Sequence, residues 1–186
     1  MKNVLVISGH PNLKRSYANI TILDELQKLI PNVEIRKLDE LYPDYKFDIE
    51  AEQSALLKAD VIVFQFPTYW YSCPGIMKLY IDLIYAHGWA YGSKGKNLVG
   101  KSLIASTTTG GKIEAYGRDA IVKHSMDDFC AYLEQFAALC NLKYGKVFCS
   151  YSMRYIPGVF PDEKKQDVID RAKIQAQDLV KYIETL

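Results

Sequence analysis

The chain has 186 residues, of which 49% are hydrophobic and 24% charged, with 23 basic side chains against 22 acidic ones. This length suits a single domain over residues 1–186, and the apolar fraction excludes intrinsic disorder. A formal net charge of +1 provides no broad basic field. Nucleic acid and an anionic membrane surface are therefore poor candidates for partners.

Cysteine usage points to a reducing compartment. Cys73, Cys130, Cys140 and Cys149 form no C-x-x-C pair, and the three histidines lie far from them in sequence. This spacing predicts no metal site and favours reduced thiols buried as small hydrophobes. The N-terminal apolar segment before Gly9 is shorter than the core of a signal peptide, and no apolar run reaches the roughly eighteen residues of a membrane span. We expect a cytoplasmic protein.

Short apolar runs alternate with amphipathic stretches along the whole chain. The runs predict strands over residues 4–7, 33–38, 61–66, 101–106 and 144–150. The stretches between them predict helices over 16–30, 49–58, 74–86 and 126–140, and a last helix capped by Asp162, whereas 41–45 reads as a loop. This alternation predicts an α/β, doubly wound, five-stranded parallel sheet of order 2-1-3-4-5 with helices on both faces.

A sheet of this order binds its ligand beyond the carboxyl ends of the strands, at the switch point between strands 1 and 3. The first loop there leads from a buried strand into a helix N-terminus, which suits a phosphate. Ser16 and Asn19 can add hydrogen bonds, and His10, Lys14 and Arg15 can add charge. The alternative is that Ser16 only caps the helix and that His10 is an ordinary loop residue.

The second and third loops have unusual compositions. Three consecutive aromatic residues, Tyr69, Trp70 and Tyr71, follow the third strand between two prolines. A single aromatic there would cover the edge of the core, but three together favour the lining of a flat aromatic ligand. The third loop ends in Gly110 and Gly111. Paired glycines let backbone N–H groups approach a ligand closely, although a simple tight turn would also need them.

Residues 95–102, GKNLVGKS, match the nucleotide-binding pattern G-x-x-x-x-G-K-[ST]. That motif needs a strand before it and a helix after it, so that the helix N-terminus meets the phosphates. Here a glycine-rich segment precedes the match and a predicted strand follows it. The context is inverted, which argues against nucleotide hydrolysis.

The motifs of these loops together resemble a known family. The sequence carries HP…SYAN, then P-x-x-W-Y-S-x-P, then K-x-x-x-D…GWAYG, and finally TTGG. Over about residues 4 to 150 it resembles the flavodoxin-like NAD(P)H:quinone oxidoreductases, the group that contains quinone reductase and the ancillary oxidoreductase of the glutathione-gated potassium/proton antiporter. The resemblance implies a flavoprotein oxidoreductase, with FMN, or else FAD, as cofactor and NAD(P)H as electron donor.

The resemblance also implies roles for particular residues. The loop that holds the flavin phosphate would comprise His10, Ser16, Tyr17, Ala18 and Asn19. The loop flanking the flavin ring would comprise Pro67, Thr68, Tyr69, Trp70 and Tyr71, and the loop at its pyrimidine side Thr108, Thr109, Gly110 and Gly111. Tyr116 has the spacing of a tyrosine that assists hydride transfer in the family. The family histidine would fall at Val122, and His124 is the nearest substitute.

The implied reaction is a two-electron, ping-pong reduction of a quinone, nitroaromatic or azo acceptor. The resemblance further implies a homodimer, with Trp89 and Tyr91 near its interface. Three alternatives stay open. The first is a one-electron flavodoxin-type carrier, although such carriers are usually acidic. The second is a regulatory subunit of a potassium/proton antiporter. The third is a phosphoprotein receiver, which would need aspartates where Ser8, Gly9 and His10 stand.

Overall fold

The computed structural model describes residues 2–186 and contains a five-stranded parallel sheet of order β2-β1-β3-β4-β5. The strands are β1 (Val4–Ser8), β2 (Glu34–Lys37), β3 (Val61–Pro67), β4 (Ser102–Thr108) and β5 (Lys143–Ser150). Both the fold class and the strand order predicted from the sequence are confirmed. The polar β2 lies at one edge of the sheet, as its composition indicated.

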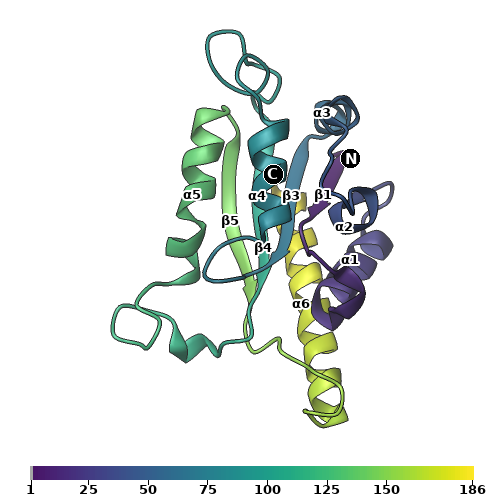
Figure 1. Cartoon of the computed structure of the whole chain (residues 1–186), viewed down its shortest axis with the longest axis vertical. Coiled ribbons are helices and arrows are strands. Elements are labelled where there is room, and N and C mark those ends of the chain that lie inside the picture. The colour runs from purple at the N-terminus through teal and green to yellow at the C-terminus, as the bar shows by residue number, and fades with distance from the viewer. Residues whose placement is uncertain (1) are drawn as a thin grey trace.

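Two layers of helices cover the sheet. The α-helices are α1 (Tyr17–Leu29), α2 (Leu38–Leu41), α3 (Ile49–Lys58), α4 (Gly75–Ile84), α5 (Met126–Leu139) and α6 (Asp162–Thr185), and the 3-10 helices are η1 (Leu13–Arg15) and η2 (Ile113–Ala115). Alternate residues of the central strands pack against α1 and α6 on one face and against α3, α4 and α5 on the other. Figure 1 shows α4 in front of the sheet, α6 behind it and α5 beside β5.

Three local predictions differ from the structure. The short helix α2 follows β2 directly and was not predicted; it overlaps the predicted loop 41–45 only at Leu41. Pro74 is the N-cap of α4 and does not lie in its first turn. Asp162 is the first residue of α6 and Pro161 is its N-cap. The Asp162 carboxylate accepts a hydrogen bond from Tyr155 Oη at 3.1 Å.

The segment that matches the nucleotide-binding pattern has a structural role. It lies in the connection between α4 and β4, which extends past the amino ends of the strands (Figure 1). Lys101 Nζ donates to the carbonyl oxygens of Leu57 at 2.8 Å and Ala59 at 2.5 Å. Lysine in this position satisfies the free carbonyls at the C-terminus of α3. No helix begins after this lysine, so the motif match is accidental.

A buried ionic network joins α3 to its neighbours. Glu52 is fully buried, and its Oε1 accepts from Arg36 Nε at 2.7 Å and from Tyr42 Oη at 2.5 Å. Its Oε2 accepts from Tyr80 Oη at 3.1 Å. Partial burial opposes the charge of Arg36, but the bonds to Glu52 and Tyr42 outweigh it and raise the Arg36 pKa. Each carboxylate oxygen therefore has a partner, which a buried charge requires.

Candidate functional site

A pocket of about 270 Å³ lies at the carboxyl edge of the sheet, where the switch-point rule places it. It is lined by His10, Arg15, Ser16, Tyr17, Ala18, Asn19, Pro67, Thr68, Tyr69, Thr108, Thr109, Gly110, Met153, Arg154 and Tyr155. The three loops selected from the sequence therefore meet around one cavity. Eleven of the fourteen residues that the resemblance assigned to the cofactor are in this lining, whereas Trp70, Tyr71 and Gly111 are not.

The first loop is fixed by close backbone packing. Gly9 donates its N–H to Gln65 O at 2.9 Å, and a Cβ at Gly9 would stand 2.6 Å from Met77 Cβ of α4. Only glycine fits between β1 and α4 here. Further on, Ser16 is the N-cap of α1, with its Oγ accepting from the backbone N–H of Asn19 at 3.0 Å. The capping role of Ser16 is therefore real, and it places the N-terminus of α1 at the pocket.

His10 enters the pocket as a neutral side chain. Its Nδ1 accepts a hydrogen bond from the backbone N–H of Asn12 at 3.0 Å, so the ring proton resides on Nε2. Burial lowers the pKa of His10 from its usual 6.5, and the nearby Asp39 carboxylate partly offsets this shift. The ring stands edge-on to Tyr69, with centroids 6.2 Å apart. His10 is thus suited to donate a hydrogen bond without carrying a charge.

A buried amide connects the first and third loops. Asn19 is 2% exposed, and its Nδ2 donates to Ser16 Oγ at 3.0 Å and to Thr108 Oγ1 at 3.1 Å. Its Oδ1 accepts from Gln65 Nε2 at 2.9 Å. The sequence motifs identified Ser16, Asn19 and Thr108 but missed Gln65. The available signal was a lone polar residue inside the most apolar strand.

The aromatic loop forms a strained tight turn. Tyr69 and Ser72 exchange backbone hydrogen bonds of 2.9 and 3.1 Å across Trp70 and Tyr71, which have φ angles of +49° and +64°. Two consecutive left-handed residues define a type I′ turn, which normally carries Asn-Gly because other side chains are strained there. Trp70 is 93% exposed. The turn therefore presents a large apolar ring outward at a conformational cost.

Tyr116 is attached to the third loop. Its Oη lies 2.7 Å from Thr109 Oγ1, and a Cβ at Gly111 would meet this hydroxyl at 2.9 Å. The absence of a side chain at Gly111 thus lets Tyr116 sit against the loop. The rings of His124 and Tyr116 both stand edge-on to Phe129, with centroids 5.7 Å away for His124 and 6.4 Å away for Tyr116. The His124 side chain is 65% exposed.

A fourth segment, missed by the sequence motifs, completes the pocket. Residues 153–155 follow β5, and Met153 donates its N–H to Thr109 O at 2.8 Å. The Tyr155 ring packs edge-on against Tyr17, with centroids 5.0 Å apart. Arg154, together with Arg15 from the first loop, adds positive charge to the lining. Because the carboxyl ends of parallel strands share one edge, the end of β5 was the signal for this segment.

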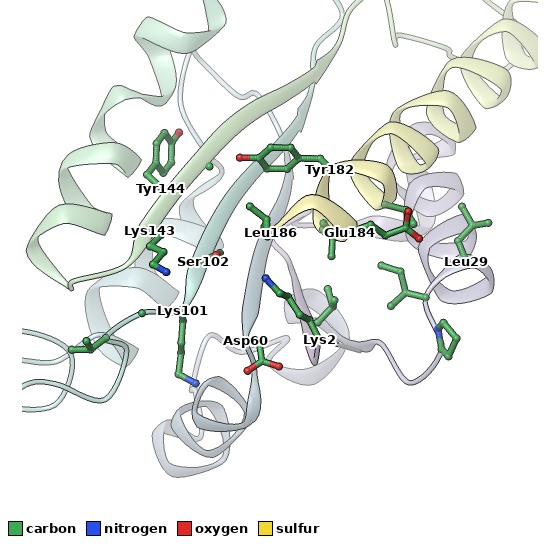
Figure 2. A pocket seen from close by; sticks show the side chains of 18 residues that line it. Lys2, Leu29, Asp60, Lys101, Ser102, Lys143, Tyr144, Tyr182, Glu184 and Leu186 are labelled. Atoms are coloured by element: carbon green, nitrogen blue, oxygen red, sulfur yellow. The ribbon is translucent and has the colours of Figure 1, made fainter.

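A larger groove of about 1080 Å³ lies at the opposite edge, around the amino ends of the strands (Figure 2). Its charged side chains are of both signs, and several are already engaged. Lys101 holds the carbonyls that end α3, and Asp60 Oδ2 accepts from the Asn3 N–H at 2.8 Å. None of the loops at the switch point reaches it, so size alone does not make it the functional site.

The thiols have no catalytic character. Cys73, Cys130, Cys140 and Cys149 are free, and burial raises the pKa of each. Within residues 2–186, no three His, Cys, Asp or Glu side chains gather in a group that could hold a metal ion. In the same part of the chain, no helix combines the length and the apolar character needed to cross a membrane.

The sheet order and the pocket at its switch point define a flavodoxin-like protein of the doubly wound α/β class. A family model described as the flavodoxin-like fold matches residues 2–179. The chain belongs to this family, which confirms the resemblance inferred from its motifs.

Individual relatives have more specific names. The glutathione-regulated potassium-efflux system ancillary protein KefF of Enterobacter sp. (strain 638) is 51% identical over 108 residues, which cover 58% of this chain and 61% of that protein. The chain thus matches less than two thirds of that relative. General stress protein 14 of Treponema denticola, solved in complex with FMN, has 28% identity and a TM-score of 0.85, with 98% of each chain covered. An NADPH-quinone reductase from P. pentosaceus has 27% identity and a TM-score of 0.76, with 95% of this chain and 98% of that one covered.

Proposed function

We propose that the protein is an FMN-dependent NAD(P)H:quinone oxidoreductase. One observation carries the proposal: the phosphate-type loop, the aromatic loop and the TTGG loop converge on a single pocket at the switch point. The likeness to an NADPH-quinone reductase and to an FMN complex supports it. The free thiols are in keeping with a cytoplasmic location.

The lining fits the two ends of FMN. At one end, the N-terminus of α1, the Ser16 hydroxyl and the Arg15 and Arg154 side chains supply donors and positive charge for a phosphate. At the other end, Tyr69 offers an aromatic surface, and the loop of Thr109 and Gly110 brings backbone groups close to the cavity. When bound, FMN would supply hydride transfer from NAD(P)H to the acceptor.

We assign proton transfer to Tyr116 and His124. Tyr116 Oη is held by Thr109 Oγ1 at the end of the pocket where the flavin ring would lie. A hydroxyl in this position can orient an acceptor oxygen and donate a proton to it. His124, which is exposed and stands edge-on to the same Phe129 ring as Tyr116, would exchange the proton with solvent. Donor and acceptor would use the same cavity in turn, which is a two-electron, ping-pong scheme.

The exposed aromatic turn supports a homodimer. Trp70 is 93% and Ile121 91% exposed, and a strained turn that presents an apolar ring to solvent is explained by a second copy covering it. Replacing Trp70 and Tyr71 by Asn and Gly restores the preferred type I′ residues. In sedimentation velocity we expect a dimer for the wild type and a monomer for this double variant. An unchanged dimer would contradict the assignment of the turn.

The central test uses the purified protein. We expect it to bind FMN, seen as a flavin spectrum after gel filtration, and to oxidise NADH or NADPH with menadione as acceptor. Replacing menadione with a nitroaromatic or azo dye tests the range of acceptors. A protein that remains colourless with both FMN and FAD would overturn the proposal. Flavin binding without NAD(P)H oxidation would favour a one-electron carrier.

A second candidate role is regulation of a potassium/proton antiporter. The observation that favours it is the 51% identity with the ancillary protein KefF over 108 residues. This role can coexist with the enzyme activity. Co-purification of the protein with membranes that contain such an antiporter tests it, and a lack of association would leave the enzyme alone.

A further inference from the structure

Three buried polar side chains, one amide and two hydroxyls, lie in a row beneath the pocket. Ser8 of β1, Gln65 of β3 and Ser106 of β4 are neighbours in register on the three central strands, and all three are fully buried. They point toward α1 and α6, as the bonds of Gln65 to Asn19 and of Gln175 to Ser106 show. A buried polar row in an otherwise apolar face is costly unless it organises something.

The row acts on the pocket through Gln65. Its Nε2 carries only protons, so it can meet Asn19 only at the acceptor Oδ1, 2.9 Å away. This contact directs Asn19 Nδ2 to the other side, where it donates to Ser16 Oγ and Thr108 Oγ1. A chain of hydrogen bonds therefore runs from Gln65 in β3 through Asn19 to two hydroxyls in the pocket lining.

This direction leaves the hydroxyls as donors. Ser16 Oγ accepts from both the backbone N–H and Nδ2 of Asn19, each at 3.0 Å, which occupies its two lone pairs. Thr108 Oγ1 also accepts from Asn19 Nδ2, at 3.1 Å. The hydroxyl protons are then free to face a ligand. If the Asn19 amide were reversed, the Ser16 and Thr108 hydroxyls would instead donate their protons to Asn19 Oδ1.

We propose that Gln65 is a positioning residue that makes the pocket selective for a phosphorylated flavin over its unphosphorylated form. It does so by orienting Asn19, so that the hydroxyl of Ser16, at the N-terminus of α1 where the phosphate would lie, meets the ligand as a proton donor. A phosphate monoester offers only acceptor oxygens, so it benefits from this arrangement more than a ribityl hydroxyl does. The inference rests on the proposed function, because it takes a flavin as the ligand.

The test compares FMN with riboflavin. Gln65→Met keeps an unbranched side chain of similar size but removes the donor. We expect it to weaken FMN binding by roughly ten- to hundredfold, the effect of losing a charge-assisted hydrogen bond, and riboflavin binding far less. The FMN-to-riboflavin affinity ratio, measured by fluorescence titration, should therefore collapse. A merely structural role of Gln65 would weaken both ligands equally, and that result would overturn the proposal.

A matched control is available on the same face. Gln175 of α6 is 5% exposed and donates to Ser106 Oγ at 2.8 Å and to Thr107 O at 3.1 Å, outside the chain that leads to Ser16. We expect Gln175→Met to lower stability while keeping the affinity ratio of the wild type. A collapse of the ratio in this variant would contradict a specific role for Gln65.

A conservative variant provides a second readout. In Gln65→Glu, burial raises the carboxyl pKa, so the protonated form can still donate to Asn19 at low pH. Once ionised it can only accept, which reverses the Asn19 amide. We expect the FMN affinity of this variant to approach that of the wild type at low pH and to fall as pH rises, more steeply than riboflavin affinity does. A pH profile equal for both ligands would argue against the proposal.

Inorganic phosphate separates this inference from the proposed function. If the wild type bound neither flavin, the proposed function would fail. The donor arrangement would then be tested by thermal shift with inorganic phosphate alone. Stabilisation of the wild type but not of Gln65→Met would support it, and equal or absent stabilisation would overturn it.

Discussion

Each face of the sheet carries a buried polar network, one around Glu52 and the other around Gln65. The two networks differ in charge and in whether they end within the protein or at the pocket. On the face of α3 and α4, an ionised Glu52 is surrounded by Arg36, Tyr42 and Tyr80, and both of its oxygens have partners. On the face of α1 and α6, Gln65 and Asn19 form a neutral chain that leads to hydroxyls in the pocket lining.

The difference separates a network for stability from a network for binding. A buried charge must have all its partners within the protein. Both oxygens of Glu52 are therefore already engaged and cannot bind a ligand. The Gln65 network ends in groups with spare protons and carries no charge that would repel a phosphate. We therefore expect substitutions in the Glu52 network to change stability and substitutions in the Gln65 network to change ligand binding.

The largest effect on stability is expected in the Glu52 network. Glu52→Ala leaves Arg36, whose side chain is only 18% exposed, without its main partner. Breaking a buried pair in this way costs about 3–5 kcal/mol of unfolding free energy. Urea denaturation measures it, with exposed Glu50→Ala on the same helix as control. The FMN dissociation constant of the folded variant should stay unchanged, and a large change in it would break the separation of the two faces.

Beside the pocket a different pattern is expected, in which turnover changes more than stability or FMN affinity. Tyr116→Phe loses the contact with Thr109 Oγ1, which should lower stability by only about 1 kcal/mol. Because the hydroxyl is assigned to proton donation, turnover with menadione should fall about a hundredfold, with little change in FMN affinity. Tyr151→Phe is the control, since its ring stands edge-on to Tyr116 with centroids 5.3 Å apart, but the hydroxyl that contacts Thr109 Oγ1 is that of Tyr116. Equal turnover in both variants would remove Tyr116 from the proposed reaction.

Substitution of Gly9 should change both stability and FMN binding. Gly9 lies at the end of β1, and a Cβ there would collide with Met77 of α4 at 2.6 Å. Gly9→Ala should therefore lower the unfolding free energy by about 1–3 kcal/mol through overpacking, and also weaken FMN binding by displacing the first loop. Gly75→Ala, where a Cβ meets nothing within 4 Å, should be neutral or stabilising. Normal FMN affinity in Gly9→Ala would show that the loop can shift without loss.

The sheet and three of the four pocket segments could be predicted because they depend on local patterns. Apolar runs such as 61–66 identify strands, and the strand order then places the loops together. Side chains whose role depends on partners far along the chain were not predictable in the same way. Gln65 and Asn19 are separated by 46 positions, and Glu52 meets Arg36 across 16. Gln65 interrupts an apolar run, which signals a buried polar residue without naming its partner, whereas Glu52 lies among other polar residues and gives no such signal.

The conformation of the aromatic loop was also beyond sequence patterns. The run of Tyr69, Trp70 and Tyr71 indicated a functional loop, but a type I′ turn is normally recognised by Asn-Gly. The strained backbone of Trp70 and Tyr71 turns these rings away from the pocket lining, so only Tyr69 reaches it. Composition predicted that the loop matters, whereas the backbone geometry decides which ring faces the ligand.

The smallest effect is expected in the pH dependence of stability, and it again distinguishes the two faces. Burial holds the pKa of His10 below its usual 6.5, so the folded protein resists protonation of this ring. As pH falls below about 6.5, the unfolded chain takes up a proton that the folded state does not, and stability decreases until the lower folded pKa is reached. The slope from one such group cannot exceed about 1.4 kcal/mol per pH unit.

His10→Gln should flatten this part of the profile, measured by urea midpoints between about pH 5 and pH 7.5. Glu52→Gln should leave the His10 contribution in place, because that network lies on the other face. If the slope persists in His10→Gln and disappears in Glu52→Gln, the titrating group belongs to the Glu52 network. The assignment of His10 as a neutral side chain that resists protonation would then be wrong.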